Sequence, residues 1–323
     1  QKHMSVTSAI KRQEKKSVLA AAAEPESKGV ALYSPAFYGL CSIGGILSCG
    51  ITHTLVTPVD LVKCRLQTGF KYNGTFHGIG EIYREGGAAG LFRGWGPTAV
   101  GYSAQGLCKF GFYELFKKEF SDLFDEETAV KYRTFVYVAA SASAEVIADV
   151  ALCPWEAIKV RVQTDPTFAK GLSDGLPKLY NAQGLGGLYK GLVPLWSRQV
   201  PYTIMKFTAF ERTVEAIYKY ALSKPRHEYN KTQQLGVTFV AGYIAGVFCA
   251  VVSHPADVVV SKLNKSADKT AGQIIKELGF AGCWTGLGPR IFMVGTLTAL
   301  QWFIYDSFKA AVNLPLAGAT AKK

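Results

Sequence analysis

Five charged side chains lie inside long apolar stretches of this sequence, and these residues are the best placed to do chemistry. Lys109, Arg198 and Lys206 are bases, and Glu145 and Asp149 are acids. A charge at the centre of an apolar layer is costly, so it normally faces a polar interior or a partner. Three bases against two acids leave an excess of positive charge, which predicts a site for a small anion. Arginine holds such an anion with paired hydrogen bonds, and lysine acts as a point charge.

Neutral side chains near these bases offer further hydrogen bonds to the same anion. Gln301 stands at the position of the third sequence repeat, defined below, that Lys109 and Lys206 hold in the first two. The predicted substrate-binding residues are Lys109, Arg198, Lys206, Gln105, Gln199, Thr203 and Gln301. No aromatic-lined pocket for adenine is evident in the sequence, which argues against nucleotide exchange.

His53 adds proton chemistry to this prediction. It is the only residue with an acidic or basic side chain between Ala36 and Val59. Histidine changes charge near neutral pH, and a carboxyl group in a low-dielectric site holds its proton more tightly. We expect a relay through His53 and Glu145, with Asp149 one turn from Glu145, that loads a proton together with the anion. The relay would end near Asp60, Glu156 and Asp257.

The stretches that carry these residues are long enough to cross a membrane as helices. Residues 232–253 contain no charged side chain, and a spanning helix takes roughly 20 residues. Several glycine-rich, nearly charge-free stretches are hard to place in a water-soluble fold. The net charge of +12 suits anionic lipid headgroups and requires no nucleic acid. Seven dispersed cysteines without a CxxC pair predict packed, reduced thiols and no metal site.

The sequence repeats itself three times, with a period of roughly 100 residues. Pro-Val-Asp-Leu-Val-Lys-Cys-Arg-Leu-Gln at 58–67 is repeated at 154–163 as Pro-Trp-Glu-Ala-Ile-Lys-Val-Arg-Val-Gln. A degraded copy, Pro-Ala-Asp-Val-Val-Val-Ser-Lys-Leu-Asn, occupies 255–264. Each copy reads as an apolar span, a polar connector and a second span. Six spans result, and an even number returns both termini to one side.

Proline bends a helix, and the charges that follow it recur in each repeat. Three symmetric bends would bring three helix ends together at the axis. Opposite charges in such a poorly hydrated ring attract each other, but desolvation offsets much of that attraction. A ring of this kind suits a gate. Its predicted members are Asp60, Lys63, Glu156, Lys159 and Asp257, with Gln67 and Gln163 as braces; Val260 replaces the third base.

A second set of charges follows an aromatic residue near the end of each repeat, and it predicts a second gate. Tyr113-Glu114 is followed by Lys117, and Tyr305-Asp306 is followed by Lys309. In the middle repeat Glu211 is followed by Val214, so this ring also lacks one base. A single pair of this kind adds only a few tenths of a kcal/mol at a surface. Its threefold recurrence favours a gate made of Tyr113, Glu114, Lys117, Glu211, Tyr305, Asp306 and Lys309.

The three motifs Pro-x-[Asp/Glu]-x-x-[Lys/Arg]-x-[Lys/Arg], two intact and one broken, resemble those of the mitochondrial carrier family over about residues 36–312. Within that family the chain resembles the phosphate-transporting members. The stretches that carry this closer resemblance are Gly-Ile-Thr-His at 50–53, Gly-Tyr-Ser-Ala-Gln-Gly-Leu-Cys-Lys-Phe-Gly at 101–111, Arg-Gln-Val-Pro-Tyr-Thr-Ile-Met-Lys-Phe at 198–207 and Ser-His-Pro-Ala-Asp at 253–257.

The resemblance implies a fold, a location and an activity. The fold is an all-α barrel of six transmembrane helices with threefold pseudosymmetry and short matrix-side helices, in the inner mitochondrial membrane. The activity is symport of inorganic phosphate with a proton, or antiport with hydroxide, by alternating access between a matrix gate and a cytoplasmic gate. The resemblance ties His53, Asp60, Glu145, Glu156 and Asp257 to the proton, and it implies a reactive thiol at Cys64, where neighbouring bases favour thiolate. An inert, packed thiol is the competing interpretation.

The predicted organisation is a basic, disordered segment at 1–34, carrier repeats at 35–124, 130–221 and 231–312, and a tail at 313–323. We expect a monomer with no cofactor and with anionic lipids, such as cardiolipin, as partners. One alternative is copper transport, with Cys41, Cys49, His53 and Cys108 as soft ligands. Another is a lipid-binding scaffold, which would require Lys109 and Lys206 to face outward. No nucleophile–base set, phosphate-binding glycine loop or metal motif indicates an enzyme.

Overall fold

The structure is a computed structural model that describes residues 30–67, 70–125, 128, 131–165, 167–222, 224, 228–265, 271–284 and 287–316. Most of the predicted segment 1–34 and of the tail 313–323 lies outside the described residues. The described part contains helices and no strand. In order, the helices are α2 (Pro35–Leu55), α3 (Thr57–Gln67), α4 (Thr75–Leu91), α5 (Trp95–Asp122), α7 (Arg133–Thr164), α8 (Leu172–Tyr189), α9 (Leu192–Ala216), the π-helical turn η1 (Ile217–Ala221), α10 (Lys231–Lys265), α11 (Ala271–Gly282) and α12 (Leu287–Ala311).

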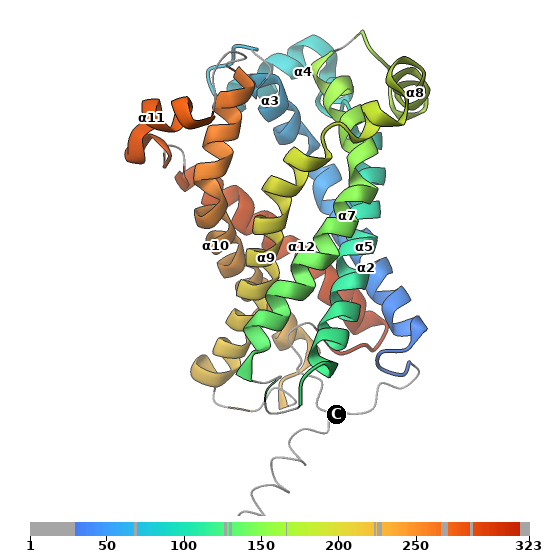
Figure 1. Cartoon of the computed structure of the whole chain (residues 1–323), viewed down its shortest axis with the longest axis vertical. Coiled ribbons are helices and arrows are strands. Elements are labelled where there is room, and N and C mark those ends of the chain that lie inside the picture. The colour runs from blue at the N-terminus through green and yellow to red at the C-terminus, as the bar shows by residue number, and fades with distance from the viewer. Residues whose placement is uncertain are drawn as a thin grey trace, which may run out of the picture.

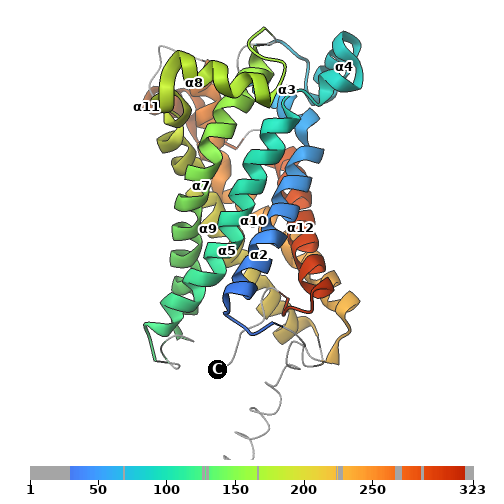
Figure 2. The same ribbon diagram turned by 90° about the vertical axis from the view of Figure 1, so that its right-hand side faces the viewer.

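Six spans form a closed ring. They are α2 with α3, then α5, α7, α9, α10 and α12, and each packs on the next until α12 returns to α2. Figures 1 and 2 show the spans running vertically, with α4, α8 and α11 across one end. We call this the connector end, and we call the opposite end, where α2 begins and α12 ends, the terminal end. The predicted all-α barrel of three repeats is confirmed.

Three helices in the described ranges are apolar and long enough to cross a membrane by composition alone. They lie at Pro35–Leu55, Arg133–Thr164 and Lys231–Val259, which are the first spans of the three repeats. The second spans are not apolar enough to qualify by composition. The bases Lys109, Arg198 and Lys206 all lie in these second spans. The central bases thus lie in second spans, whereas the central acids Glu145 and Asp149 lie in α7, which is a first span.

The repeated prolines act differently in the three repeats. Pro58 separates two helices, because α2 ends at Leu55 and α3 begins at Thr57. A proline in the first turn of a helix needs no partner for its missing N–H. Pro154 and Pro255 instead lie inside continuous helices, α7 and α10. The predicted symmetric bend is thus a full break in the first repeat only.

The connector helices share a feature that the sequence analysis did not identify. Each of α4, α8 and α11 is interrupted by a glycine with positive φ: Gly87 at 61°, Gly184 at 63° and Gly279 at 60°. Residues with a Cβ rarely adopt this backbone conformation. The three glycines end the first part of each connector helix and let a second short turn lead back to the bundle.

Glycine also allows the spans to approach each other closely. Gly242 and Gly246 of α10 lie close to α12, since a Cβ on either would meet the backbone of α12 at Ala299 or Gly295. The same close approach joins α2 to α5. A Cβ on Gly45 would lie 2.1 Å from the carbonyl oxygen of Gly106.

Gly45→Ala is therefore expected to destabilise the protein, because overpacking of a close contact costs about 1–3 kcal/mol. Thermal unfolding of the purified protein in detergent is the measurement. Gly39→Ala is the matched control in the same helix, since a Cβ at that position would meet no atom within 4 Å apart from its own stretch of helix. It should be neutral or slightly stabilising because alanine favours helix. Equal melting temperatures for the two variants would contradict the assigned contact.

Candidate functional site

A cluster of buried polar side chains lies inside the ring, at mid-height of the spans. Lys109 from α5 forms an ion pair with Glu145 from α7, with Nζ 2.8 Å from Oε2. The same Nζ lies 3.3 Å from Thr203 Oγ1 of α9. Gln105 donates from Nε2 to Glu145 Oε1 at 3.0 Å and to Asp149 Oδ1 at 3.1 Å. The structure thus brings five of the predicted residues into one network across three helices.

Lys206 occupies a different part of the same interior. Its side chain is 1% exposed, and its ammonium group donates to Gln301 Oε1 of α12. The ammonium nitrogen also lies 5.7 Å from the centre of the Phe110 ring. Among the described residues, no carboxylate forms an ion pair with Lys206. A buried cation that is held only by a neutral amide and aromatic faces lacks the partner that such a charge normally requires.

The interior position of both lysines excludes the lipid-scaffold alternative. Lys109 and Lys206 are 3% and 1% exposed, and their partners come from neighbouring spans rather than from the outer surface. The lipid-scaffold alternative requires them to face outward, which the structure contradicts.

Arg198 does not join this cluster, contrary to the prediction that it acts beside the two lysines. It lies on α9 about two helical turns, or roughly 12 Å, nearer the connector end than Lys206. There its guanidinium group is 3.8 Å from Glu156. Gln199, next to it, forms no hydrogen bond with the central group in the described structure. The central group therefore contains two bases, Lys109 and Lys206, and two acids, Glu145 and Asp149. Lys206 is unmatched because both acids lie on the side of Lys109.

His53 lies against Tyr102 and Gln301. Its ring stacks on that of Tyr102, with centroids 3.7 Å apart and an interplanar angle of 11°. Its Nε2 lies 3.0 Å from Gln301 Nε2. Glu145, the predicted next member of the relay, instead contacts Lys109 and Gln105. The structure does not bring His53 and Glu145 into contact, so their predicted relay has no direct link in this conformation.

The repeated acids of the first gate meet bases at the connector end, though only partly in the expected pairs. Lys159 forms ion pairs with Asp60 of the preceding repeat and with Glu156 of its own helix. Asp257 forms an ion pair with Arg290 of α12. Lys63 forms no ion pair with a described residue.

Arg198 and Arg290 thus supply positive charge to a ring that lacks a base at residue 260. The sequence analysis missed Arg290, although it directly follows the proline that opens the last span. Of the two predicted braces, Gln163 is not engaged in the described structure. The side-chain amide of Gln163 is buried and has no hydrogen-bond partner there. The side chain of Gln67 lies outside the described part.

The second set of charges forms a network at the terminal end. Lys117 lies 2.9 Å from Glu114 and 3.5 Å from Glu211, and Lys309 lies 3.8 Å from Glu114. Tyr113 donates to Glu211 at 3.2 Å. In the middle repeat Val214 stands at the position of the base. That position therefore offers no base to Asp306, which accepts a hydrogen bond from Thr238 at 2.7 Å. This network links α5, α9, α10 and α12.

Aromatic side chains fill the interior between the central cluster and this network. Phe210 stacks on Trp302 with centroids 3.6 Å apart, and Tyr305 packs on Phe110 at 4.2 Å. The terminal-end acids are accordingly well buried, with Glu211 2% exposed, whereas Asp60 at the connector end is 29% exposed. The terminal end is the more tightly sealed of the two in this structure.

Two further predictions concern cysteine chemistry. Cys64 is a partly buried cysteine between Lys63 and Arg65 on α3, and its reactivity stays a prediction. Cys41 and Cys49 are buried in two separate apolar clusters. The described residues contain no group of three histidine, cysteine or acidic side chains placed to hold a metal ion. Nothing in that part of the chain favours the copper alternative.

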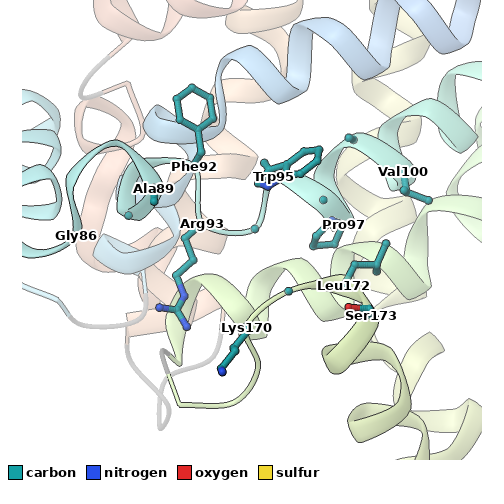
Figure 3. A pocket seen from close by; sticks show the side chains of 15 residues that line it. Gly86, Ala89, Phe92, Arg93, Trp95, Pro97, Val100, Lys170, Leu172 and Ser173 are labelled. Carbon is teal, nitrogen blue, oxygen red and sulfur yellow. The ribbon is translucent and has the colours of Figure 1, made fainter.

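A groove of about 870 Å³ opens on the outside of the connector end (Figure 3). It lies between the end of α4, the first turn of α5 and the start of α8. Arg93 lines it from one side and Lys170 from the other. Arg93 also donates to the carbonyl oxygens of Val162 at 2.9 Å and Ala169 at 3.4 Å, which ties the first repeat to the second.

A closed ring of three helical repeats, with polar groups inside and charged networks at both ends, defines a membrane transport protein. The comparisons with known proteins agree. The chain matches the mitochondrial carrier protein family over residues 34–123, 130–221 and 231–314. It belongs to the mitochondrial carrier family. Like other members, it is a multi-pass transporter of the mitochondrial inner membrane and not an enzyme.

Several relatives are similar over nearly the whole chain. Mitochondrial phosphate carrier protein 3 of Arabidopsis thaliana is 57% identical, over 98% of this chain and 84% of its own length. The mitochondrial phosphate carrier protein of Caenorhabditis elegans is 61% identical, over 86% and 82%. Solute carrier family 25 member 3 of Homo sapiens is 58% identical, over 92% and 82%.

Proposed function

We propose that this protein transports inorganic phosphate across the mitochondrial inner membrane together with a proton, or equivalently in exchange for hydroxide. The observation that carries the proposal is Lys206, a buried cation without an acidic partner among the described residues. An anion at this site would supply the missing charge with charge-assisted hydrogen bonds. The names of the relatives, several of which are phosphate carriers, select phosphate among small anions.

The surrounding groups suit a tetrahedral oxyanion. Lys206 would bind one oxygen. Thr203 on the same helix and Lys109 lie on the adjoining side of the cluster, where Glu145 balances the charge of Lys109. Gln105 and Gln301 would contribute amide N–H donors. Arg198 would attract the anion at the connector end, between the central site and the opening at that end.

Co-transport of a proton follows from the cost of moving charge through the membrane. A phosphate anion carries its charge against the membrane potential, and a proton that travels with it cancels one charge. His53 lies one amide away from Lys206, and histidine is the side-chain type that changes charge near neutral pH. We assign the proton to His53. Glu145 and Asp149 would adjust the local field, and Asp60, Glu156 and Asp257 would take part when the connector end opens.

The two charged networks would act as gates in alternating access. By the orientation of the family, the connector end faces the matrix and the terminal end faces the cytoplasm. The tight terminal network and the aromatic packing beside it support a conformation that is closed toward the cytoplasm. In the matrix gate, Arg290 would hold Asp257 while Lys63 is unpaired. Closure would transfer Asp257 to Lys63, because Asp60 pairs with the base of the next repeat in the same way.

The groove at Arg93 and Lys170 supports the predicted anionic-lipid partner, such as cardiolipin. The first turns of α5 and α8 both border it, and helix N-termini favour phosphate groups. A monomer is sufficient for this function, since one chain closes the ring by itself.

Uptake of labelled phosphate into liposomes that contain the purified protein tests the proposed function. A pH gradient that is alkaline inside should drive net uptake well above the level seen without a gradient. Dicarboxylate and copper, offered under the same conditions, should not be accumulated. Liposomes without protein are the baseline. Absence of gradient-dependent phosphate uptake would overturn the proposal.

A further inference from the structure

One side chain, Gln301, connects the unmatched cation to the histidine. It lies on α12, is 2% exposed, and its backbone carbonyl accepts a hydrogen bond from Ser48 of α2 at 2.6 Å. Its Oε1 accepts from Lys206. Its Nε2 lies 3.3 Å from Thr52 Oγ1 and 3.0 Å from His53 Nε2. A single amide therefore bridges α9 and α2.

The chemistry of lysine decides which way this amide points. An ammonium group has only donors, so the atom that faces Lys206 must be the amide oxygen. The amide NH₂ group then faces His53. Because that group is a donor, His53 Nε2 must accept, which means that this nitrogen carries no proton in the structure.

A proton on His53 Nε2 would break the bridge. The new N–H would face the NH₂ group, so two donors would oppose each other. Rotation of the amide would not help, because it would turn the NH₂ group toward the ammonium of Lys206. Gln301 cannot satisfy both neighbours once His53 is charged. The oxygens of an oxyanion act only or mainly as hydrogen-bond acceptors. An oxyanion would therefore satisfy Lys206, protonated His53 and the amide NH₂ group together.

We propose that Gln301 couples the proton to the anion: its amide holds Lys206 while His53 is neutral and releases Lys206 for phosphate when His53 takes up a proton. This inference rests on the proposed function and deepens it. Gln301 acts here as a positioning residue as well as a ligand. By linkage, bound phosphate would favour protonation of His53 by the same factor as the proton favours phosphate.

Other charged groups also lie around His53 and act on its charge. They are Asp60 on α3, Lys109 on α5, Lys159 on α7 and Lys206 on α9, while the Tyr102 ring covers one face. Their charges act on His53 whether or not Gln301 is present. The amide of Gln301 determines whether protonation of His53 releases Lys206. The effect of Gln301 on Lys206 can therefore be separated from the effect of the surrounding charges on His53.

The test is the pH dependence of phosphate affinity, measured by phosphate–phosphate exchange in liposomes between about pH 6 and about pH 8. The wild-type protein should lose affinity as the pH rises, by roughly tenfold for a typical coupling free energy. In Gln301→Met, Lys206 is no longer held at high pH, so the dependence should be weaker than in the wild-type protein and should retain only the direct attraction of protonated His53 and the ionisation of phosphate. Gln301→Asn is too short to reach both neighbours and should behave in the same way.

Two other variants complete the design. Gln301→Glu would pair with Lys206 at every pH, and so affinity should fall at both ends of the range. Leu300→Ala, on the more exposed side of α12, should keep the wild-type profile. Phosphate ionises identically in every sample, so differences between variants belong to the protein.

The outcomes separate the two proposals. If the wild-type protein takes up phosphate with a pH gradient but Gln301→Met and Gln301→Asn keep the wild-type pH profile, the coupling role is overturned and the transport function stands. A uniform loss of affinity without a change of profile would indicate a merely structural role and would also overturn it. If the wild-type protein takes up no phosphate, the proposed function fails, and the coupling fails with it.

Discussion

Replacement of Lys206 by glutamine is expected to lower phosphate transport by about 100-fold, in exchange as well as in net uptake. Glutamine keeps hydrogen-bonding ability and much of the length of lysine but removes the charge. Loss of one partner of a buried charge pair costs about 2–5 kcal/mol, and each 1.4 kcal/mol is tenfold in affinity. Initial rates of labelled phosphate uptake as a function of phosphate concentration are the measurement.

Two controls belong with this prediction. Lys206→Arg keeps the charge and should retain part of the activity, with a changed affinity because the guanidinium group is larger and planar. Lys219→Gln, an exposed lysine in the π-helical turn η1, should transport like the wild type. Near-normal phosphate exchange by Lys206→Gln would show that Lys206 does not bind the anion.

Replacement of His53 by alanine is expected to abolish the component of uptake that a pH gradient drives. Without a group that takes up the proton, the gradient has no site through which to act. Phosphate–phosphate exchange needs no net proton movement and should persist at a reduced rate. The ratio of gradient-driven uptake to exchange is therefore the measurement, and it should fall by roughly tenfold or more, within the range of typical couplings.

A second substitution separates proton chemistry from packing. His53→Phe preserves an aromatic ring against Tyr102 but cannot be protonated, so it should lose the gradient response as His53→Ala does. His77→Ala, an exposed histidine on α4, is the control and should behave as the wild type. Gradient-driven uptake that survives in both His53 variants would assign the proton to another group.

The missing bases of the two gates lie at the same seam of the ring. At the terminal end, a base pairs with the acid of the next repeat, as Lys117 does with Glu211. Val214 therefore stands where the symmetric base for Asp306 would be. At the connector end, an acid pairs with the base of the next repeat, so Val260 stands where the symmetric base for Glu156 would be. Both losses fall between the second and third repeats, where Phe210 stacks on Trp302 instead.

The seam between the first and second repeats keeps its ionic links. Lys159 and Asp60 join these repeats at one end, and Lys117 and Glu211 join them at the other. Arg65 adds to this seam by donating to the backbone carbonyl of Gln163 at 3.3 Å. The first two repeats are thus tied together more firmly than the second is to the third.

The sequence by itself determined the fold class, the repeats and the identity of most interior polar groups. These features depend on composition and period: apolar stretches of membrane length, three copies of one motif, and charges that cannot face lipid. The position of Lys109, Lys206, Glu145 and Thr203 in one interior follows from those rules. So does the recurrence of charged residues at both ends of the spans.

Only the tertiary structure decided which charges meet. Arg198 pairs with Glu156 and does not lie in the predicted central site, and Arg290 pairs with Asp257. These pairs form because the choice of partner depends on the height of each side chain along the axis and on how far it reaches across to neighbouring helices. The bridge from Lys206 through Gln301 to His53 joins three spans that lie far apart in the chain. No spacing rule within one helix predicts such a contact, since it arises only where the ring closes and α12 returns to α2.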